Sequence, residues 1–242
     1  MLSEEIIVEK TNLLHLEEVN KEAKKLNIDL ILIGGNSVRA YTEPRSWRFT
    51  KDLDFITTSK NLGLLYGMCS TLGYSIEKTD YGLAGRKKIT DKYSIELHIS
   101  VDKVLDWSTG AIYILPEDIF RLSRYVPIKA SFEENRELIV VARCAPIEDV
   151  VILKLMTERS RDHFDSVAII LDSFDRIDLI RFKRICEDSE LVKIIKERIE
   201  SLIVDNRRGV IARLWKENTG FNFIATRQND LRKKLRALLE LM

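Results

Sequence analysis

Two aspartates lie two positions apart in this 242-residue chain, and their spacing points to chemistry. Asp52 and Asp54 alternate with the apolar residues Leu53 and Phe55. In a β-strand, this alternation places both carboxylates on one face and both apolar side chains on the other. The carboxylates then lie about 6.6 Å apart along the strand, because each residue rises about 3.3 Å. Like charges this close are unfavourable without a cation, so the pair predicts a site for one or two Mg²⁺ or Mn²⁺ ions.

A glycine turn precedes the acidic pair. Gly34 and Gly35 end the apolar run 30–33, which predicts a buried strand followed by a sharp turn. Glycine permits a positive φ and lets a bound group approach the backbone closely. The next residues favour a helix with Asn36 or Ser37 at its N-cap, so that backbone N–H groups at Gly35 and Asn36 would face a phosphate. The alternative is that the glycines form only a turn and the aspartates only a solvated strand edge.

Together, the apolar strand, Gly-Gly, a helix and then Arg-x-Thr-x-Asp-x-Asp-Phe resemble the signature of the DNA polymerase β-type nucleotidyltransferase superfamily. The pattern is most similar to the minimal bacterial and archaeal branch that includes the nucleotidyltransferase toxins of abortive-infection systems. Arg48 and Thr50 stand where that branch has an Arg and a Ser or Thr ahead of the acidic pair. The resemblance implies a magnesium-dependent transferase that binds a nucleoside triphosphate such as ATP. It would use Gly34, Gly35 and Asn36 for the nucleotide, with Arg48 and Thr50 nearby.

Members of this superfamily need a third carboxylate on a later strand. In the segment 93–99, Glu96 and His98 alternate with apolar residues and so share the polar face of an expected strand. The resemblance makes Glu96 either the general base for the attacking hydroxyl or a metal ligand; an ordinary surface Glu is the alternative. Asp91 and Asp102 are weaker alternatives because both lie near expected strand ends. For His98, a metal ligand, a hydrogen-bond partner of the site and a surface residue all stay open.

A second block, Lys-x4-Arg-x-Arg-Asp-x-x-Asp, begins at Lys154 and is also similar to the toxin-like branch. By that resemblance, Lys154 would contact the triphosphate, and Asp162 or Asp165 would complete or brace the site. Because burying an unpaired ammonium is unfavourable, a lysine in an apolar helical run predicts a phosphate or a carboxylate partner. The alternative is that Lys154 reaches out along its helix and the charged residues form a solvated lattice.

Strand-like patterns dominate the first part of the chain and helical periodicity dominates from Pro146 onward. We therefore expect an α+β protein, with a mixed β-sheet nucleotidyltransferase core over residues 1–145 and a helical domain over 146–242. A hairpin is expected around residues 133–136. No apolar stretch approaches the roughly 20 residues that span a bilayer, and the acidic N-terminus is unlike a signal peptide, so a cytoplasmic enzyme is expected.

The acceptor of the transferred nucleotide is left open between RNA, including tRNA, protein and a small molecule. The net charge is only +1, which does not indicate nucleic acid, although the basic tract 227–236 is either an RNA contact or a solvated helix face. A toxin role would imply an antitoxin partner. Two other classes stay open. One is a catalytically degenerate nucleotide- or partner-binding protein; the other is an antibiotic-type adenylyltransferase, for which an acidic pocket accepting a cationic substrate would be the sign.

Overall fold

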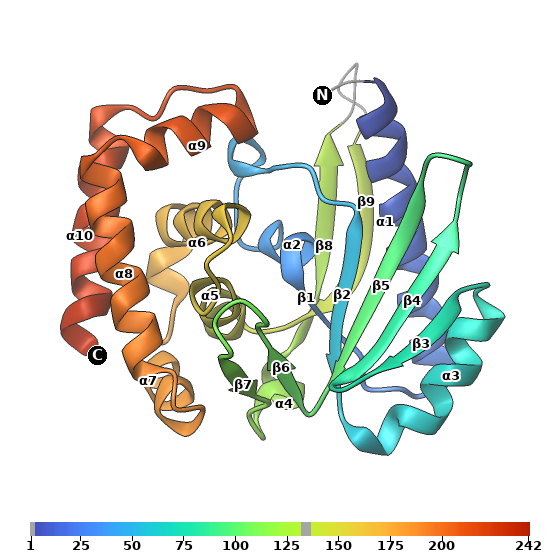
Figure 1. Cartoon of the computed structure of the whole chain (residues 1–242). Helices are drawn as coiled ribbons and strands as arrows, with labels where there is room; N and C mark the ends of the chain where they lie inside the picture. Colours follow the sequence, from blue (N-terminus) through green and yellow to red (C-terminus); the bar gives the residue numbers. More distant parts are fainter. Residues whose placement is uncertain (1–2, 132–136) are drawn as a thin grey trace. The chain divides into compact units, whose positions relative to one another are not determined.

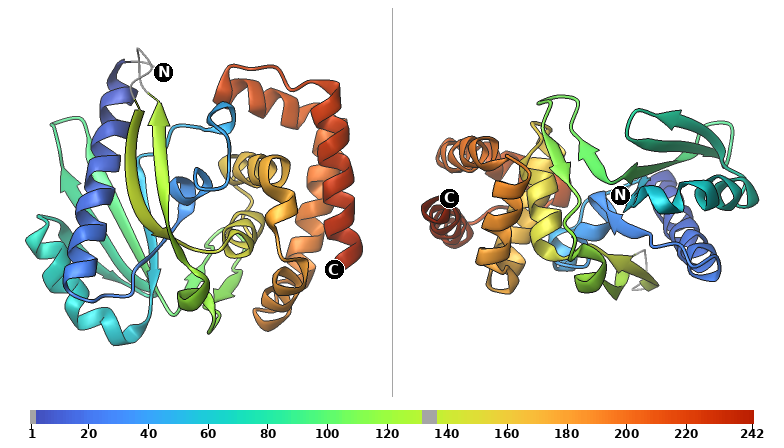
Figure 2. Two further views of the ribbon diagram at one scale, coloured as in Figure 1. Left: turned by 180° about the vertical axis from the view of Figure 1, so that it is seen from behind. Right: turned by 90° about the horizontal axis from the view of Figure 1, so that it is seen from below.

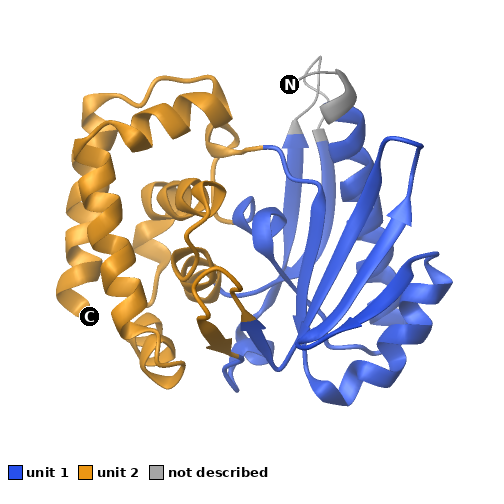
Figure 3. Ribbon diagram, viewed as in Figure 1, with its two compact units in different colours: residues 1–40, 49–104, 115–146 blue, residues 41–48, 105–114, 147–242 orange. Residues whose placement is uncertain are grey.

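The computed structural model describes residues 3–131 and 137–242, which form two compact units (Figures 1 and 3). Unit 1 comprises Met1–Ala40, Phe49–Val104 and Leu115–Pro146, and unit 2 comprises Tyr41–Arg48, Leu105–Ile114 and Ile147–Met242. The last change of unit lies next to the predicted boundary after residue 145. Two earlier segments within the predicted core also belong to unit 2.

A seven-stranded mixed sheet forms the centre of unit 1, with the strand order β3-β4-β5-β2-β1-β9-β8. Its strands are β1 (Ile31–Ile33), β2 (Asp52–Thr57), β3 (Ser75–Thr79), β4 (Gly82–Lys88), β5 (Ser94–Val101), β8 (Arg124–Ser131) and β9 (Glu137–Cys144). β2 runs parallel to β5, and β1 parallel to β9; the other neighbours are antiparallel. The predicted hairpin turn at 133–136 lies outside the described residues. β6 (Lys103–Leu105) and β7 (Ile112–Ile114) form a separate two-stranded sheet.

Helices α1 (Ser3–Lys25) and α3 (Leu62–Thr71) cover one face of this sheet (Figure 2). Leu16 of α1 and Met68 of α3 belong to the same buried core as Leu53 and Phe55 of β2. The alternation over residues 52–55 of β2 therefore directs its aspartates to the opposite face, as the sequence predicts. The short helices α2 (Gly34–Val38) and α4 (Ile119–Leu122) also belong to unit 1.

Unit 2 consists mainly of helices. They are α5 (Ile147–Leu155), α6 (Ser160–Ser173), α7 (Leu179–Asp188), α8 (Val192–Arg207), α9 (Val210–Thr219) and α10 (Ala225–Leu241). Gly209 and Gly220, both with positive φ, flank α9 and mark its two ends. In the core, the ring of Trp215 lies 5.2 Å from that of Phe164 and 5.1 Å from that of Phe223. The α+β class, with a mixed sheet and C-terminal helices, is confirmed. Within the described ranges, no helix is both long and apolar enough to cross a membrane.

Candidate active site

The register of the sheet brings the predicted acidic residues together on one face of unit 1. Parallel pairing of β2 with β5 sets Asp52 opposite Glu96 and Asp54 opposite His98. All four side chains lie on the face opposite the buried core, because Leu53 and its alternate neighbours fill the core face. We call Asp52, Asp54 and Glu96 the acidic cluster. The structure thus places the third predicted carboxylate on the strand beside the aspartate pair.

His98 is a hydrogen-bond partner of the acidic cluster. Its Nδ1 lies 3.2 Å from Oδ1 of Asp54. This hydrogen bond raises the pKa of His98 above its ordinary value against the opposing effect of burial, and the charges of Asp54, Asp52 and Glu96 add to the rise. The direction of the shift shows that the imidazole lies in a negative field.

Asp52 lies in an electrostatically unfavourable environment. Burial is the main cause that raises the pKa of its carboxyl, and the negative charges of Asp54 and Glu96 raise it further, against Lys51 and His98. Its Oδ1 is buried without a hydrogen-bond partner in the part of the chain that the structure describes. A buried acceptor atom without a donor is unfavourable, so this oxygen fits a bound cation.

The glycine turn packs directly against the acidic cluster. Gly34 has a φ of +71°, and a Cβ built on it would lie 2.0 Å from Oδ2 of Asp54. A larger residue would therefore be strained in its backbone and would also collide with the carboxylate. The prediction that Asn36 or Ser37 caps the following helix was wrong, because α2 begins at Gly34 with Ile33 at the N-cap. The positive φ of Gly34 lets the helix start immediately after the strand.

Asn36 holds the backbone beneath the acidic cluster. Its Nδ2 donates to the carbonyl oxygen of Asp52 at 3.0 Å and to Oδ1 of Asn12 at 3.0 Å. Nδ2 of Asn12 in turn donates to the carbonyl oxygen of Lys51 at 2.7 Å. The sequence pattern predicted an N-cap role for Asn36 rather than these contacts, and Asn12 was not predicted. Asn12 could have been found because it lies beside the apolar residue Leu13 in a helix. A buried amide at this position needs polar partners.

The donors of the acidic cluster fit Mg²⁺ or Mn²⁺ when completed by a substrate. Across residues 3–131 and 137–242, no group of three or more His, Cys, Asp or Glu side chains forms a ready-made metal site. Mg²⁺ is usually held by one or two carboxylates together with substrate phosphates and water, and carboxylate oxygens also suit Mn²⁺. The unpaired oxygen of Asp52 and the close packing of Asp54 on the glycine turn agree with such a partial site.

Three residues of the second predicted block and Arg48 of the first motif form a buried charge cluster within unit 2. We define this cluster as Arg48, Lys154, Asp162 and Asp165. Nζ of Lys154 lies 2.7 Å from Oδ1 of Asp162 and 2.9 Å from Oδ2 of Asp165. Arg48 forms a two-pronged ion pair with Asp165, with both N–O distances at 2.7 Å. Since the Lys154 side chain is only 7% exposed, the solvated-lattice alternative was wrong for this lysine.

The charges in this cluster stabilise one another. Burial lowers the pKa of Lys154, but Asp165 and Asp162 outweigh it, so the pKa lies above its ordinary value. Burial likewise raises the pKa of Asp162, and Lys154 and Arg159 outweigh it in the other direction, so the pKa is lowered. The carboxylate partner that the sequence offered as one explanation of Lys154 is present.

The remaining predicted residues have their own positions. Thr50 is buried in unit 1, whereas Arg48 of the same motif belongs to unit 2. In the basic tract, Arg227 lies 2.9 Å from Asp172, and Nζ of Lys234 donates to the carbonyl oxygen of Leu171 at 2.8 Å. These two cations of the tract therefore have partners within unit 2.

Comparisons with known proteins support the fold. No family model matches the sequence, and no curated protein matches it. Among solved structures, the chain is similar to MenT4, a nucleotidyltransferase toxin from Mycobacterium tuberculosis, with a TM-score of 0.51 and 14% identity over 98% of this chain and 85% of that chain. It also matches the antibiotic-resistance factor ANT(2'')-Ia in solution, with a TM-score of 0.44 and 15% identity over 84% of this chain and 98% of that chain.

A third match is the lincosamide antibiotic adenylyltransferase LnuA, with a TM-score of 0.35 and 16% identity over 61% of this chain and 89% of that chain. The likeness to MenT4 carries the conclusion, since its TM-score is the one above 0.5 among these three. The chain has the fold of a nucleotidyltransferase. The nucleotidyltransferase fold that the sequence resemblance implied is thereby confirmed.

Proposed function

We propose that this chain is a metal-dependent nucleotidyltransferase. A hydroxyl oxygen of the acceptor attacks the α-phosphorus of a nucleoside triphosphate, the bond to the bridging oxygen of the β-phosphate breaks, and pyrophosphate leaves. The observation that carries the proposal is the acidic cluster. Its three carboxylates share one face of the sheet, and their mutual repulsion contributes to the raised pKa of Asp52. The nucleotidyltransferase fold supports it.

Each residue around the acidic cluster has a role in this proposal. Asp52 and Asp54 would hold Mg²⁺ or Mn²⁺, which would supply positive charge for the negative charge that develops on the reacting oxygens. Glu96 accepts the proton of the attacking hydroxyl. His98 orients Asp54 through its hydrogen bond, and Asn36 fixes the backbone of Asp52. These contacts set the carboxylates before the substrate binds, which is how positioning lowers a barrier.

Binding of the triphosphate by the other predicted residues stays a prediction. Gly34 and the backbone N–H groups of Gly35 and Asn36 are proposed to face the phosphates, with Thr50 nearby. For Arg48, Lys154 and Asp162, the ion pairs within unit 2 already provide a partner for each charge. A nucleotide contact by these residues would have to compete with, or add to, those ion pairs.

The likeness of the fold to a toxin supports a toxin-like setting for this activity, in which an antitoxin protein restrains the enzyme. Expression of the wild-type chain should then slow the growth of a bacterial host, whereas the Asp54→Asn variant at equal level should not. Equal growth of the two cultures would contradict the toxin role without bearing on the transfer chemistry.

The transfer itself is tested by radiolabel incorporation. The protein is incubated with each of four α-³²P-labelled nucleoside triphosphates, Mg²⁺ or Mn²⁺, and cellular RNA, protein or small-molecule fractions. We expect label in at least one fraction, none with Asp52→Asn, and none from a γ-³²P-labelled triphosphate, because that phosphate leaves in pyrophosphate. Label from the γ position would indicate phosphoryl transfer instead. Nucleotide binding without any label would indicate the degenerate, binding-only alternative.

A further inference from the structure

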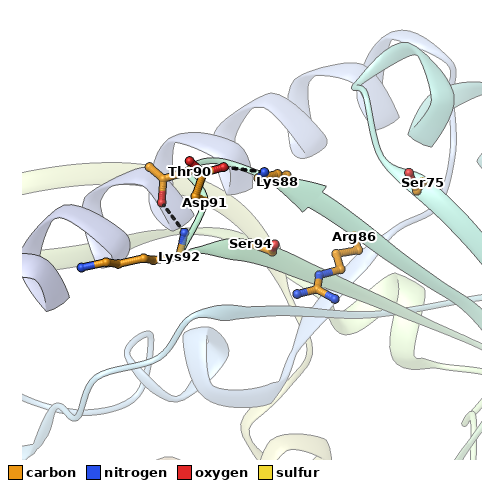
Figure 4. A pocket seen from close by; sticks show the side chains of 7 residues that line it. All are labelled: Ser75, Arg86, Lys88, Thr90, Asp91, Lys92 and Ser94. Atoms are coloured by element: carbon orange, nitrogen blue, oxygen red, sulfur yellow. Dashed lines mark hydrogen bonds and ion pairs between the residues drawn. The ribbon is translucent and has the colours of Figure 1, made fainter.

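A groove of about 270 Å³ lies beside the acidic cluster in unit 1 (Figure 4). Its walls come from β3, β4 and β5 and from the turn that joins β4 to β5. Three cations, Arg86, Lys88 and Lys92, line it, together with the hydroxyl groups of Ser75 and Ser94. We call it the basic groove.

The strand register links the basic groove to the acidic cluster. Arg86 pairs with Glu96 across β4 and β5, and Glu96 pairs with Asp52 across β5 and β2. At about 4.8 Å between neighbouring strands, the Cα atoms of Arg86 and Asp52 are about 10 Å apart. A second groove, of about 370 Å³, is lined by Arg86, Glu96 and His98 and so joins the two regions. The basic groove therefore begins about two strands from the proposed reaction centre, on the same face.

The residues that line the basic groove include more cations than carboxylates. In the described part of the chain, Arg86 forms no ion pair, although it lies on an exposed position opposite Glu96. Lys88 lies 2.6 Å from Asp91, but the side chains are 67% and 96% exposed, and such a pair is weak in water. Asp91 is the one carboxylate among the residues that line the groove. This excess is local, since the whole chain has a net charge of only +1.

We propose that the basic groove binds a phosphate group of the acceptor, so that the acceptor is a phosphate-bearing anion and not a cationic molecule. The proposal rests on the function proposed above and names its substrate class. A guanidinium matches the oxygens of a phosphate in two parallel hydrogen bonds, and Ser75 and Ser94 add donors beside Arg86. A phosphate held there leaves about 10 Å to the acidic cluster for the rest of the acceptor, including its attacking hydroxyl. A cationic antibiotic would be repelled at this position.

The test removes two cations with Arg86→Gln/Lys88→Gln. The matched control is Lys78→Gln, which removes one positive charge from an exposed position of β3 that does not line the groove. The probes are a fluorescent single-stranded 12-nucleotide RNA, ribose 5-phosphate and inorganic phosphate; Mn²⁺–ATP affinity is measured separately. We expect phosphate-probe binding to weaken about tenfold or more in the double variant. Mn²⁺–ATP affinity should stay within about twofold, the control should match wild type in both, and Arg86→Lys should recover part of the lost binding.

A comparison of the RNA probe with ribose 5-phosphate distinguishes a nucleic acid acceptor from a phosphorylated small molecule. A nucleic acid acceptor predicts that the RNA binds more tightly than ribose 5-phosphate, with a salt dependence that is shallower in the double variant. A phosphorylated small molecule predicts that ribose 5-phosphate binds at least as tightly as the RNA and is equally sensitive to the variant. Either result supports the basic groove as a phosphate site.

Three results overturn the inference: unchanged binding of all probes by the double variant, no binding of any probe by wild type, or efficient labelling of a cationic aminoglycoside. Each of them leaves Mn²⁺–ATP binding intact if the proposed function is correct. If wild type did not bind Mn²⁺–ATP at all, the proposed function would be rejected instead. The exposed positions of Arg86 and Lys88 make misfolding a minor concern, and the melting temperature of each variant checks it.

Discussion

The acidic cluster of unit 1 and the buried charge cluster of unit 2 both contain aspartates, but they differ in whether Lys or Arg side chains neutralise those carboxylates. No Lys or Arg among the described residues forms an ion pair with Asp52, Asp54 or Glu96. In unit 2, by contrast, Asp162 and Asp165 each have a cationic partner at 2.7 Å. A carboxylate that the chain neutralises itself stabilises the fold, whereas one without a Lys or Arg partner on a sheet face is available to bind an external cation, as proposed above. Charge balance, rather than the presence of a motif, therefore separates the two regions.

The largest expected effect is on the acidic cluster. Asp52→Asn removes an oxygen that we propose binds the metal, so we expect transfer to fall about a thousandfold or more. The metal-free protein should melt at the same or a higher temperature, because the change removes a like charge beside Asp54 and empties no core volume. The measurements are label transfer and the melting temperature, with Asp80→Asn, an exposed acid, as the control. If Asp52→Asn transferred label at the wild-type rate with Mg²⁺, Asp52 would not be a metal ligand.

The opposite response is expected from the buried charge cluster. Lys154→Met leaves Asp162 and Asp165 short of positive charge inside the protein, so the free energy of unfolding should fall by about 3–5 kcal/mol. Urea denaturation without nucleotide measures it. Lys193→Met, at a side chain 87% exposed, is the control and should change stability by less than about 0.5 kcal/mol. If stability instead holds or rises while nucleotide affinity drops, Lys154 is a nucleotide contact and the comparison fails.

The pH dependence sharpens the same result. The lowered pKa of Asp162 means that its stabilisation is present above the ordinary value of 3.8 and is lost as pH falls through the shifted pKa. The raised pKa of Lys154 means that its stabilisation is present below 10.5 and is lost as pH rises through the shifted pKa. The stability difference between wild type and Lys154→Met should therefore be largest between these limits and should shrink in acid. If the stability difference between wild type and Lys154→Met grew in acid, the ion pairs of Lys154 would not stabilise the fold.

Glu96→Gln separates catalysis from binding within the acidic cluster. If Glu96 accepts the hydroxyl proton, kcat should fall about a hundredfold while triphosphate affinity stays the same, since the interaction acts in the transition state. Single-turnover rates and equilibrium binding give the two quantities. Equal losses in both would make Glu96 a metal ligand or a structural residue.

The smallest expected effect is that of Gly34→Ala. The new Cβ meets Oδ2 of Asp54 and the backbone keeps a positive φ, so we expect a loss of about 1–3 kcal/mol in unfolding free energy together with reduced transfer. Gly63→Ala in α3 is the control, because no atom lies within 4 Å of its Cβ position. Full activity of Gly34→Ala would show that the position of the Asp54 carboxylate does not matter.

The local features of the site were predictable from the sequence. The alternation of Asp52 to Phe55 has the period of a strand, and the glycines end the preceding strand, so both features depend only on neighbouring residues. Glu96 was found by the same alternation. Its position opposite Asp52, however, depends on the parallel pairing of β2 with β5, which no local pattern specifies.

The features that were missed depend on contacts between distant segments. Arg48 belongs to unit 2, where it pairs with Asp165. Residues 105–114 also belong to unit 2, where the hydroxyl of Tyr113 donates to Asp149. Such long-range hydrogen bonds leave no periodic signal in the sequence. The N-cap was mispredicted for a related reason. The side chain of Asn36 donates to the backbone of β2 and does not cap its own helix.

The most direct test of the central claim is a Mn²⁺ titration of the protein with a non-hydrolysable ATP analogue, followed by electron paramagnetic resonance. Wild type and Lys154→Met are compared with the double variant Asp52→Asn/Asp54→Asn. We expect tight Mn²⁺ binding by wild type and a loss of about a hundredfold or more in the double variant, since both proposed ligands are removed. Equal Mn²⁺ affinity in wild type and the double variant would contradict the claim that the unbalanced carboxylates of the sheet form the metal site.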